Sequence, residues 1–142
     1  IDMSTTPRSR MRRRSKDGTQ FVTYGNGSIK EIHTNGTTVI RYPNGDVKTY
    51  SADNGTIAYH YAASKVTEVR KDNDKSNTIF EFPNGQVEQH WNDGRKIVSF
   101  PDGTTQRVAP DGSAETVLAK HPSSVHVEHS NGEQEWLHVA TN

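Results

Sequence analysis

The sequence predicts an all-β fold: a single open antiparallel β-meander of roughly twelve strands, with both faces largely exposed to solvent. Two observations carry this prediction, a regular spacing of turn-forming Asn-Gly and Asp-Gly pairs and a shortage of apolar residues. The residues AVILMFWYC make up 30% of the 142-residue chain, against roughly 40% in an average globular domain once glycine is set aside. Either disorder or a fold that needs little core would account for this composition.

Charge and aromatic content favour the ordered alternative. Disordered chains of this polarity usually carry a large net charge and few aromatic residues, whereas here 17 basic residues balance 17 acidic ones and eleven aromatics recur along the chain. The balanced charge gives no reason to expect a nucleic acid or a membrane as partner. Cysteine is absent, which excludes disulfides and permits a reducing compartment. No apolar run reaches the length of a membrane span or signal peptide, so we expect a soluble, intracellular segment, and the first residue, Ile1, suggests a piece of a longer chain.

The turn glycines follow one another at intervals of nine or ten residues, and the two longer gaps, of thirty and twenty residues, are multiples of this unit. Asn-Gly and Asp-Gly pairs favour tight hairpin turns because glycine adopts a positive φ at little cost. About seven residues then remain for each strand, close to the usual strand length. The glycines of these pairs are Gly18, Gly27, Gly36, Gly45, Gly55, Gly85, Gly94, Gly103, Gly112 and Gly132.

Three segments depart from this regular pattern. Residues 1–17 carry six cationic side chains and are interpreted as a basic flexible linker ahead of a sheet domain at 18–140; a solvated tail is favoured over a targeting or nucleic-acid signal. The run Tyr59-His60-Tyr61-Ala62-Ala63 places two tyrosines on one face where a turn glycine is missing. The polar run at 70–77 predicts a wide loop.

The strands offer too few apolar residues for a closed or two-layered fold. A barrel or a sandwich needs one continuous apolar face on each strand, and the strand that begins at Gln86 offers only Val87 and Trp91. An open sheet that is wetted on both faces remains. Its stability would come from cross-strand pairs and from the stems of long polar side chains that lie flat on the sheet.

Proline before several of the turn pairs, as in Pro83-Asn84-Gly85, predicts the register of the hairpins. Proline presets φ for the first corner of a type I turn, and glycine then takes the left-handed position of a three-residue loop. In this register Phe82 faces Gln86 and lies on the same side as Glu88. A two-residue turn would send Glu88 to the opposite face, because a slip of one residue inverts the side chains. We favour the proline-led register.

The repeated hairpins at 40–48, 80–90 and 98–104, with the Tyr-x-Tyr-Ala-Ala run at 59–63 between them, resemble a known family. They are similar to the glycine-repeat (G-box) domain that ends CPAP-type centriole assembly proteins, also called the T-complex-protein C-terminal domain. The resemblance covers about Gly18 to Val139. The longer stretch at 70–77 and the degenerate last repeats depart from the family's pattern.

The resemblance implies a free-standing sheet that binds a short proline-rich motif of a STIL-type partner during centriole duplication, at the centrosome within the cytoplasm and cytoskeleton. It places the peptide-binding site on Tyr42, Tyr59, Phe82 and Glu88, with Tyr61 as the alternative to Tyr59. Proline rings stack on aromatic faces, and an extended polyproline II ligand loses little entropy on docking. Without the resemblance, Tyr42 and Phe82 would be interpreted as cross-strand packing residues and Glu88 as a solvated acid.

Other functions find less support in the residues. No nucleophile elbow, phosphate loop or pair of catalytic carboxylates is visible, so we expect neither an enzyme nor a cofactor. His126 and His129 lie close together but lack a second ligand pair at metal spacing, so no metal site is expected. The main alternative is a structural role: end-to-end self-association through the unpaired first and last strands, expected near Val22 and Val127.

Overall fold

The computed structural model describes residues 10–139, and these residues form fourteen β-strands and no helix. The strands lie in one antiparallel sheet in which spatial order follows chain order, so the sheet stays open with β1 and β14 at its two edges. The predicted fold class is confirmed, with fourteen strands in place of roughly twelve. The chain divides into two compact units, 1–73 and 74–142, which are described separately below.

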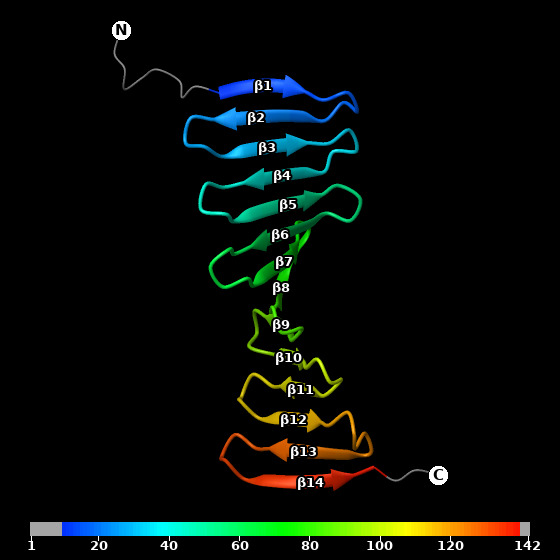
Figure 1. Ribbon diagram of the computed structural model, residues 1–142. Coiled ribbons are helices and arrows are strands. Elements are labelled where there is room, and N and C mark those ends of the chain that lie inside the picture. Colours follow the sequence, from blue (N-terminus) through cyan, green and yellow to red (C-terminus); the bar gives the residue numbers. More distant parts are fainter. Residues whose placement is uncertain (1–9, 140–142) are drawn as a thin grey trace, which may run out of the picture. The chain divides into compact units, whose positions relative to one another are not determined.

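The first unit contains seven strands joined by short turns. Figure 1 shows these strands stacked side by side in chain order. They are β1 (Arg10–Arg14), β2 (Gln20–Tyr24), β3 (Ile29–Ile32), β4 (Thr38–Arg41), β5 (Val47–Ser51), β6 (Thr56–His60) and β7 (Thr67–Lys71).

The second unit repeats the same arrangement with seven further strands. They are β8 (Asp74–Glu81), β9 (Val87–Trp91), β10 (Lys96–Ser99), β11 (Thr105–Val108), β12 (Ala114–Val117), β13 (Ser124–Glu128) and β14 (Gln134–His138).

Strand β1 forms from residues that the sequence analysis assigned to a basic linker. Its five residues pair with β2 along their whole length, from Arg10 opposite Tyr24 to Arg14 opposite Gln20. The guanidinium of Arg13 lies 4.6 Å from the centre of the Phe21 ring, a cation–π contact that an arginine can make in a strand. Residues 10–14 are therefore part of the sheet, while residues 1–9 lie outside the described residues and the division at residue 17 stays a prediction.

The wide loop predicted at 70–77 is wrong. Strand β7 runs to Lys71 and β8 begins at Asp74, so only two residues lie between them. Polar residues misled the prediction because an open sheet does not require apolar residues in its strands: both faces are wetted, and a polar side chain there loses no water.

The turn at Pro43-Asn44-Gly45 shows how the regular hairpins close. The backbone N–H of Tyr42 donates to the carbonyl of Asp46 (2.9 Å), and the N–H of Gly45 donates back to the carbonyl of Tyr42 (3.0 Å). The side-chain oxygen of Asn44 accepts from the N–H of Asp46 (2.9 Å), and Gly45 has φ of +93°. This is the predicted three-residue loop with glycine in the left-handed position, which explains why each repeat needs Asn or Asp before glycine.

Little of the protein is shielded from water. Among the described residues the buried apolar side chains are Val22, Val98 and Val127, each in the middle of a strand with strands on both sides. Between residues 10 and 139 there is no helix long and apolar enough to cross a membrane. Stability therefore depends on the hydrogen-bonded ladder and on cross-strand pairs rather than on a core.

Candidate peptide-binding surfaces

Three tyrosines of the first unit lie on one face and touch one another. Tyr42 follows β4, Tyr59 lies in β6 and Tyr61 comes two residues later, so alternation along the strand keeps the last two on the same side. The ring centres of Tyr42 and Tyr59 are 5.9 Å apart, and those of Tyr59 and Tyr61 are 4.6 Å apart. These distances are typical of packed aromatic pairs. We call these three residues the tyrosine group.

Two hydroxyls of the tyrosine group, those of Tyr59 and Tyr61, donate to carboxylates. Tyr59 Oη donates to Asp46 Oδ2 (2.7 Å), and the backbone N–H of Ala62 donates to Asp46 Oδ1 (2.8 Å). Tyr61 Oη donates to Glu68 Oε2 (2.9 Å). The hydrogen bond to Asp46 raises the pKa of Tyr59 to about 12, and the bond from Ala62 holds the pKa of Asp46 below its ordinary value. Tyr59 is thereby fixed in the middle of the group, while Tyr61 is 40% exposed.

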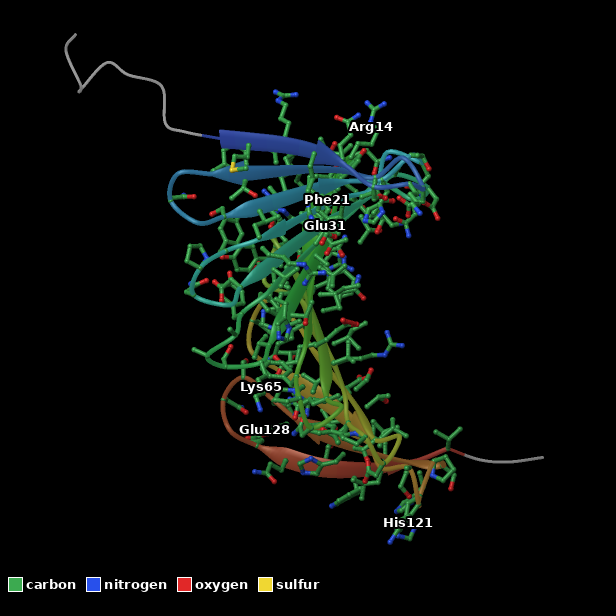
Figure 2. The ribbon with its side chains drawn as sticks, turned by 45° about the horizontal axis from the view of Figure 1, so that its top comes forward. Arg14, Phe21, Glu31, Lys65, His121 and Glu128 are labelled. Atoms are coloured by element: carbon green, nitrogen blue, oxygen red, sulfur yellow. The ribbon has the colours of Figure 1, made fainter. Side chains whose placement is uncertain are left out.

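The loop after Tyr61 explains how this arrangement forms without a turn glycine. Lys65, labelled in Figure 2, takes the left-handed conformation with φ of +60°. The N–H of Lys65 donates to the carbonyl of Tyr61 (2.8 Å), and the N–H of Tyr61 donates to the carbonyl of Val66 (2.9 Å). The loop carries Ala62 over Gly45: a Cβ added at position 45 would lie 3.1 Å from the Cβ of Ala62. The interrupted repeat therefore packs against the preceding Pro-Asn-Gly turn.

A hollow of about 250 Å³ adjoins the tyrosine group. A larger hollow, of about 470 Å³, lies in the second unit and is described below. The smaller hollow combines aromatic walls with charged groups of both signs, so it can receive an apolar ring and a polar neighbour. Sequence reasoning missed the residues that share it with the two tyrosines, because their proximity depends on the register of β5, β6 and β7. Its lining consists of Lys48, Ile57, Tyr59, Tyr61, Glu68 and Arg70.

Phe82 and Glu88 lie on one face of the second unit, as the proline-led register predicts. The N–H of Phe82 donates to the carbonyl of Gln86 (2.9 Å), and Phe80 is directly opposite Glu88. Opposite residues of an antiparallel pair share a face, and so do residues two apart along a strand. Phe82 is half-buried. The predicted register and the shared face of Phe82 and Glu88 are both confirmed.

Polar neighbours hold the carboxylate of Glu88. Gln86 Nε2 donates to Oε2 (2.8 Å), His90 Nε2 lies 2.9 Å from Oε1, and Lys96 Nζ lies 4.0 Å from Oε1. Partial burial raises the pKa of Glu88. The bonds from His90 and Gln86 and the charge of Lys96 together lower this pKa by more than burial raises it, so the net shift is downward. The side chain is 16% exposed, so it remains partly accessible to a ligand.

The larger hollow lies on the opposite face of the second unit from Glu88. Its floor includes Trp91, Ile97 and Val127, and the register places Ile97 opposite Gln89, between the positions of Glu88 and His90. The guanidinium of Arg95 covers the Trp91 ring at 4.8 Å. The structure thus brings the predicted residues together in two groups, the tyrosine group of the first unit and the Phe82–Glu88 group of the second.

Comparison with known proteins gives a family match and several similar structures. Residues 16–50 and 92–120 match the family model described as T-complex protein 10 C-terminus. The TCP10 domain of CPAP from Danio rerio, solved with a peptide of Danio rerio STIL, is 31% identical; the match covers 90% of this chain and 68% of that chain, with a TM-score of 0.71. A comparison with curated proteins finds no match.

Two other solved structures are similar at lower identity. The SAS-4 (dCPAP) TCP domain of Drosophila melanogaster, in complex with a proline-rich motif of Ana2 (dSTIL), is 26% identical over 92% of this chain and 90% of that chain, with a TM-score of 0.63. The G-box domain of the microcephaly protein CPAP is 27% identical over 87% of this chain and 100% of that chain, with a TM-score of 0.62.

Proposed function

This chain belongs to the family of T-complex protein 10 C-terminal domains, the G-box domains of CPAP-type proteins, and we propose that its sheet binds a short proline-rich motif of a STIL-type partner. The complexes of the zebrafish domain with a STIL peptide and of the fly domain with a proline-rich motif of Ana2 support this proposal. The activity is that of a binding module rather than of a catalyst, and it needs no cofactor.

The tyrosine group is the observation that carries the proposal. A single-layer sheet cannot enclose a ligand, so the ligand must be held by rings exposed on its surface. Tyr42, Tyr59 and Tyr61 form a continuous aromatic surface beside a hollow, which suits the rings of an extended proline-rich segment. Tyr61 is the most accessible of the three, so we assign it a direct contact together with Tyr42 and Tyr59.

Phe82 and Glu88, in the second unit, form a candidate contact of different chemistry. Phe82 offers one half-buried ring, and Glu88 offers an ionised carboxylate that can accept a hydrogen bond from a peptide N–H or from a basic side chain. Because Gln86 and His90 already hold this carboxylate, the peptide meets it in a fixed orientation. We assign Glu88 to positioning the peptide rather than to supplying most of the affinity.

The role that follows is that of a scaffold in centriole assembly. A binding module of this kind would link the protein that carries it to a STIL-type partner at the centriole, within the centrosome. The zebrafish and fly relatives, both solved with peptides of such partners, support this location.

A fluorescence-anisotropy titration tests the proposal. The full 142-residue chain is titrated against a labelled proline-rich peptide of a STIL-type partner, beside Phe82→Ala, Glu88→Val and the control Arg107→Gln. Arg107 is exposed and is the register partner of Ile97, on the opposite face from Glu88. We expect saturable binding that each of the first two changes weakens by about 1 to 3 kcal/mol, while the control binds normally. Circular dichroism checks that every variant keeps its β-structure. Absence of binding to the unchanged chain, or equal weakening by Arg107→Gln, would reject the proposed site.

Edge-to-edge self-association is a second candidate, favoured by one observation. Edge strand β14 exposes Trp136 (52%) and Leu137 (48%), and its backbone has no neighbour on the outer side within the described residues. Such an edge can add a strand of another molecule. The sequence analysis placed the edges near Val22 and Val127; the structure has one further strand outside each of them.

Proline substitutions in the edge strands separate the two candidates. Met11→Pro and Leu137→Pro each disturb one edge and leave the tyrosine group unchanged, so we expect them to abolish any concentration-dependent light scattering but to preserve peptide binding. Scattering that persists unchanged in both variants would remove edge-to-edge association as a function of this sheet.

A further inference from the structure

One face of the first unit carries a row of cations that the tyrosine group does not explain. The row lies along a single line across the strands, because each residue is the register partner of the next. A cation occupies every second strand from β1 to β5 and an apolar residue stands between successive cations. The row then reaches Tyr59 of the tyrosine group and ends at Glu68. Its members are Arg12, Val22, Lys30, Ile40, Lys48, Tyr59 and Glu68.

Packing accounts for the length of these cationic side chains but not for their charge. Val22, between Arg12 and Lys30, is only 4% exposed, and the aliphatic stems of its two neighbours are well placed to cover it while their charged heads stay in water. Methionine or glutamine would cover Val22 equally well. The repeated choice of a cation therefore points to an interaction of the charged heads.

Within the described part of the chain, none of Arg12, Lys30 and Lys48 makes a side-chain hydrogen bond or an ion pair. The opposite face differs. There Glu31, on the strand next to that of Phe21 (Figure 2), pairs with Arg41 at 3.3 Å.

The carboxylates on the same face as the row lie at its tyrosine end. Asp46 and Glu68 already accept hydrogen bonds from the hydroxyls of Tyr59 and Tyr61. A hydrogen bond from a hydroxyl leaves the negative charge of a carboxylate in place, and both carboxylates lie near Lys48, Asp46 two residues before it and Glu68 in the same hollow. The positive charge of the row is therefore least balanced at Arg12 and Lys30, farther from the tyrosine group.

The spacing of the row matches one conformation of a peptide. Cations two strands apart are separated by about 9.5 Å, since neighbouring strands lie about 4.7 to 4.9 Å apart. A polyproline II helix has three residues per turn and rises about 3.1 Å per residue, so every third residue returns to the same side after about 9.3 Å. A peptide in this conformation, running across the strands, would bring every third side chain over a cation.

We propose that Arg12, Lys30 and Lys48 bind an acidic stretch adjoining the proline-rich motif of the partner, with an acidic residue at every third position. The inference rests on the proposed function and extends it, because Lys48 and Tyr59 are register partners and line the same hollow. The peptide would continue from the tyrosine group along the row. A single-stranded nucleic acid fits less well, since it needs rings on which bases can stack, and the side chains between the cations are Val22 and Ile40.

Matched peptides test the spacing. The proline-rich motif is compared with versions extended at either end by Glu-Pro-Pro-Glu-Pro-Pro-Glu, or by Glu-Glu-Glu-Pro-Pro-Pro-Pro, which has the same composition. At about 50 mM salt we expect the spaced extension, at one of the two ends, to tighten binding about tenfold and the clustered one by less than threefold. At about 300 mM salt the gain should largely vanish, because salt screens exposed charges.

Variants of the chain assign the gain to the row. Lys30→Gln removes the middle cation and should reduce the gain of the spaced extension about threefold, whereas Lys71→Gln, an exposed cation on the opposite face, should leave it unchanged. Circular dichroism verifies that both variants fold.

Each part of the inference can fail separately. Equal gains from the spaced and clustered extensions, or equal losses in Lys30→Gln and Lys71→Gln, would overturn the proposal that the row binds an acidic stretch. Tighter, Lys30-dependent binding of a single-stranded oligothymidylate than of the spaced peptide would assign the row to nucleic acid instead. Failure of the unextended motif to bind would count against the proposed function alone, because the spaced extension is also measured as a separate peptide.

Discussion

The tyrosine group and the Phe82–Glu88 group hold their functional side chains by different means. In the first, rings support one another, with centres 4.6 and 5.9 Å apart, and the carboxylate of Asp46 fixes the middle hydroxyl. In the second, a carboxylate is held by an amide and an imidazole, at 2.8 and 2.9 Å. A sheet without a core cannot fix side chains by burial, so it uses ring contacts in one place and polar bonds in the other. The two groups should therefore respond differently to mutation and to salt.

Removal of the middle ring should have the largest effect. Tyr59→Ala deletes the ring that contacts both other tyrosines, and we expect it to weaken peptide binding by about 2 to 3 kcal/mol, the range of a central interface anchor. The loss should be the same at low and high salt, because stacking does not depend on net charge. Anisotropy titrations at two salt concentrations measure it.

A conservative variant separates the ring from its hydroxyl. Tyr59→Phe keeps the ring and removes only the bond to Asp46, so it should weaken peptide binding by about 1 kcal/mol. If Tyr59→Phe weakened binding as much as Tyr59→Ala, the orientation of Asp46 rather than the aromatic surface would be the source of affinity.

Loss of the charge at Glu88 should have a smaller, salt-dependent effect. Glu88→Gln keeps the shape of the side chain, and we expect it to weaken peptide binding by about 1 to 1.5 kcal/mol at low salt and by less at high salt. The same pair of salt concentrations is used as for Tyr59→Ala. An effect of Glu88→Gln that does not change with salt would mean that the carboxylate acts through local packing and not through its charge.

Two glycines test how far the tyrosine group depends on the turn beneath it. Gly45 and Gly112 have nearly the same φ, +93° and +90°, but a Cβ at Gly45 would lie 3.1 Å from Ala62, while a Cβ at Gly112 has nothing within 4 Å. Alanine at either position pays for the left-handed conformation, about 1 to 2 kcal/mol.

Gly45→Ala must in addition displace the loop that follows Tyr61. We therefore expect Gly45→Ala to lower the free energy of unfolding by about 1 kcal/mol more than Gly112→Ala, measured by urea denaturation. Equal losses would show that the loop moves aside freely and is not what orders the tyrosines.

Much of this architecture could be predicted because the turns are local. The Pro-Asn-Gly turns contain in three residues everything that sets their geometry, so the meander, its register and the shared face of Phe82 and Glu88 followed from sequence. Strand β1 could not be recognised in the same way, because an arginine-rich strand and a solvated tail have the same composition. In a sheet with both faces wetted, an arginine-rich segment can form a strand or remain a tail. Its pairing with β2 shows that residues 10–14 form a strand.

The residues around the tyrosines were missed for a different reason. Asp46, Glu68 and Arg70 reach Tyr59 and Tyr61 through the register of three strands across a loop that has no glycine. Lys65 occupies the left-handed position there, and no residue preference marks lysine for that role. Sequence reasoning found the rings but not the carboxylates that orient them.

The smallest expected effect is the pH dependence of the bond between Tyr59 and Asp46. The pKa of Asp46 in the folded chain lies below its ordinary value of 3.8, so the folded state binds this proton less tightly than the unfolded state does. The contribution of Asp46 to stability is therefore present above the unfolded pKa and is lost as the pH falls through the folded pKa. For Tyr59, whose pKa is raised to about 12, the contribution is present below its ordinary pKa of about 10 and is lost as the pH rises through the folded value.

The bond should thus persist across neutral pH and weaken at both extremes. Urea midpoints of the unchanged chain and of Asp46→Asn, measured from about pH 7 down to about pH 3, should differ most at neutral pH and converge in acid. A difference between the two chains that stays constant down to acid pH would mean that the protonated carboxyl of Asp46 holds the tyrosine group as well as the ionised one does, so that hydrogen-bond geometry and not charge is what the amide of Asp46→Asn fails to supply. The first unit would then be fixed by shape, and only the Phe82–Glu88 group by charge.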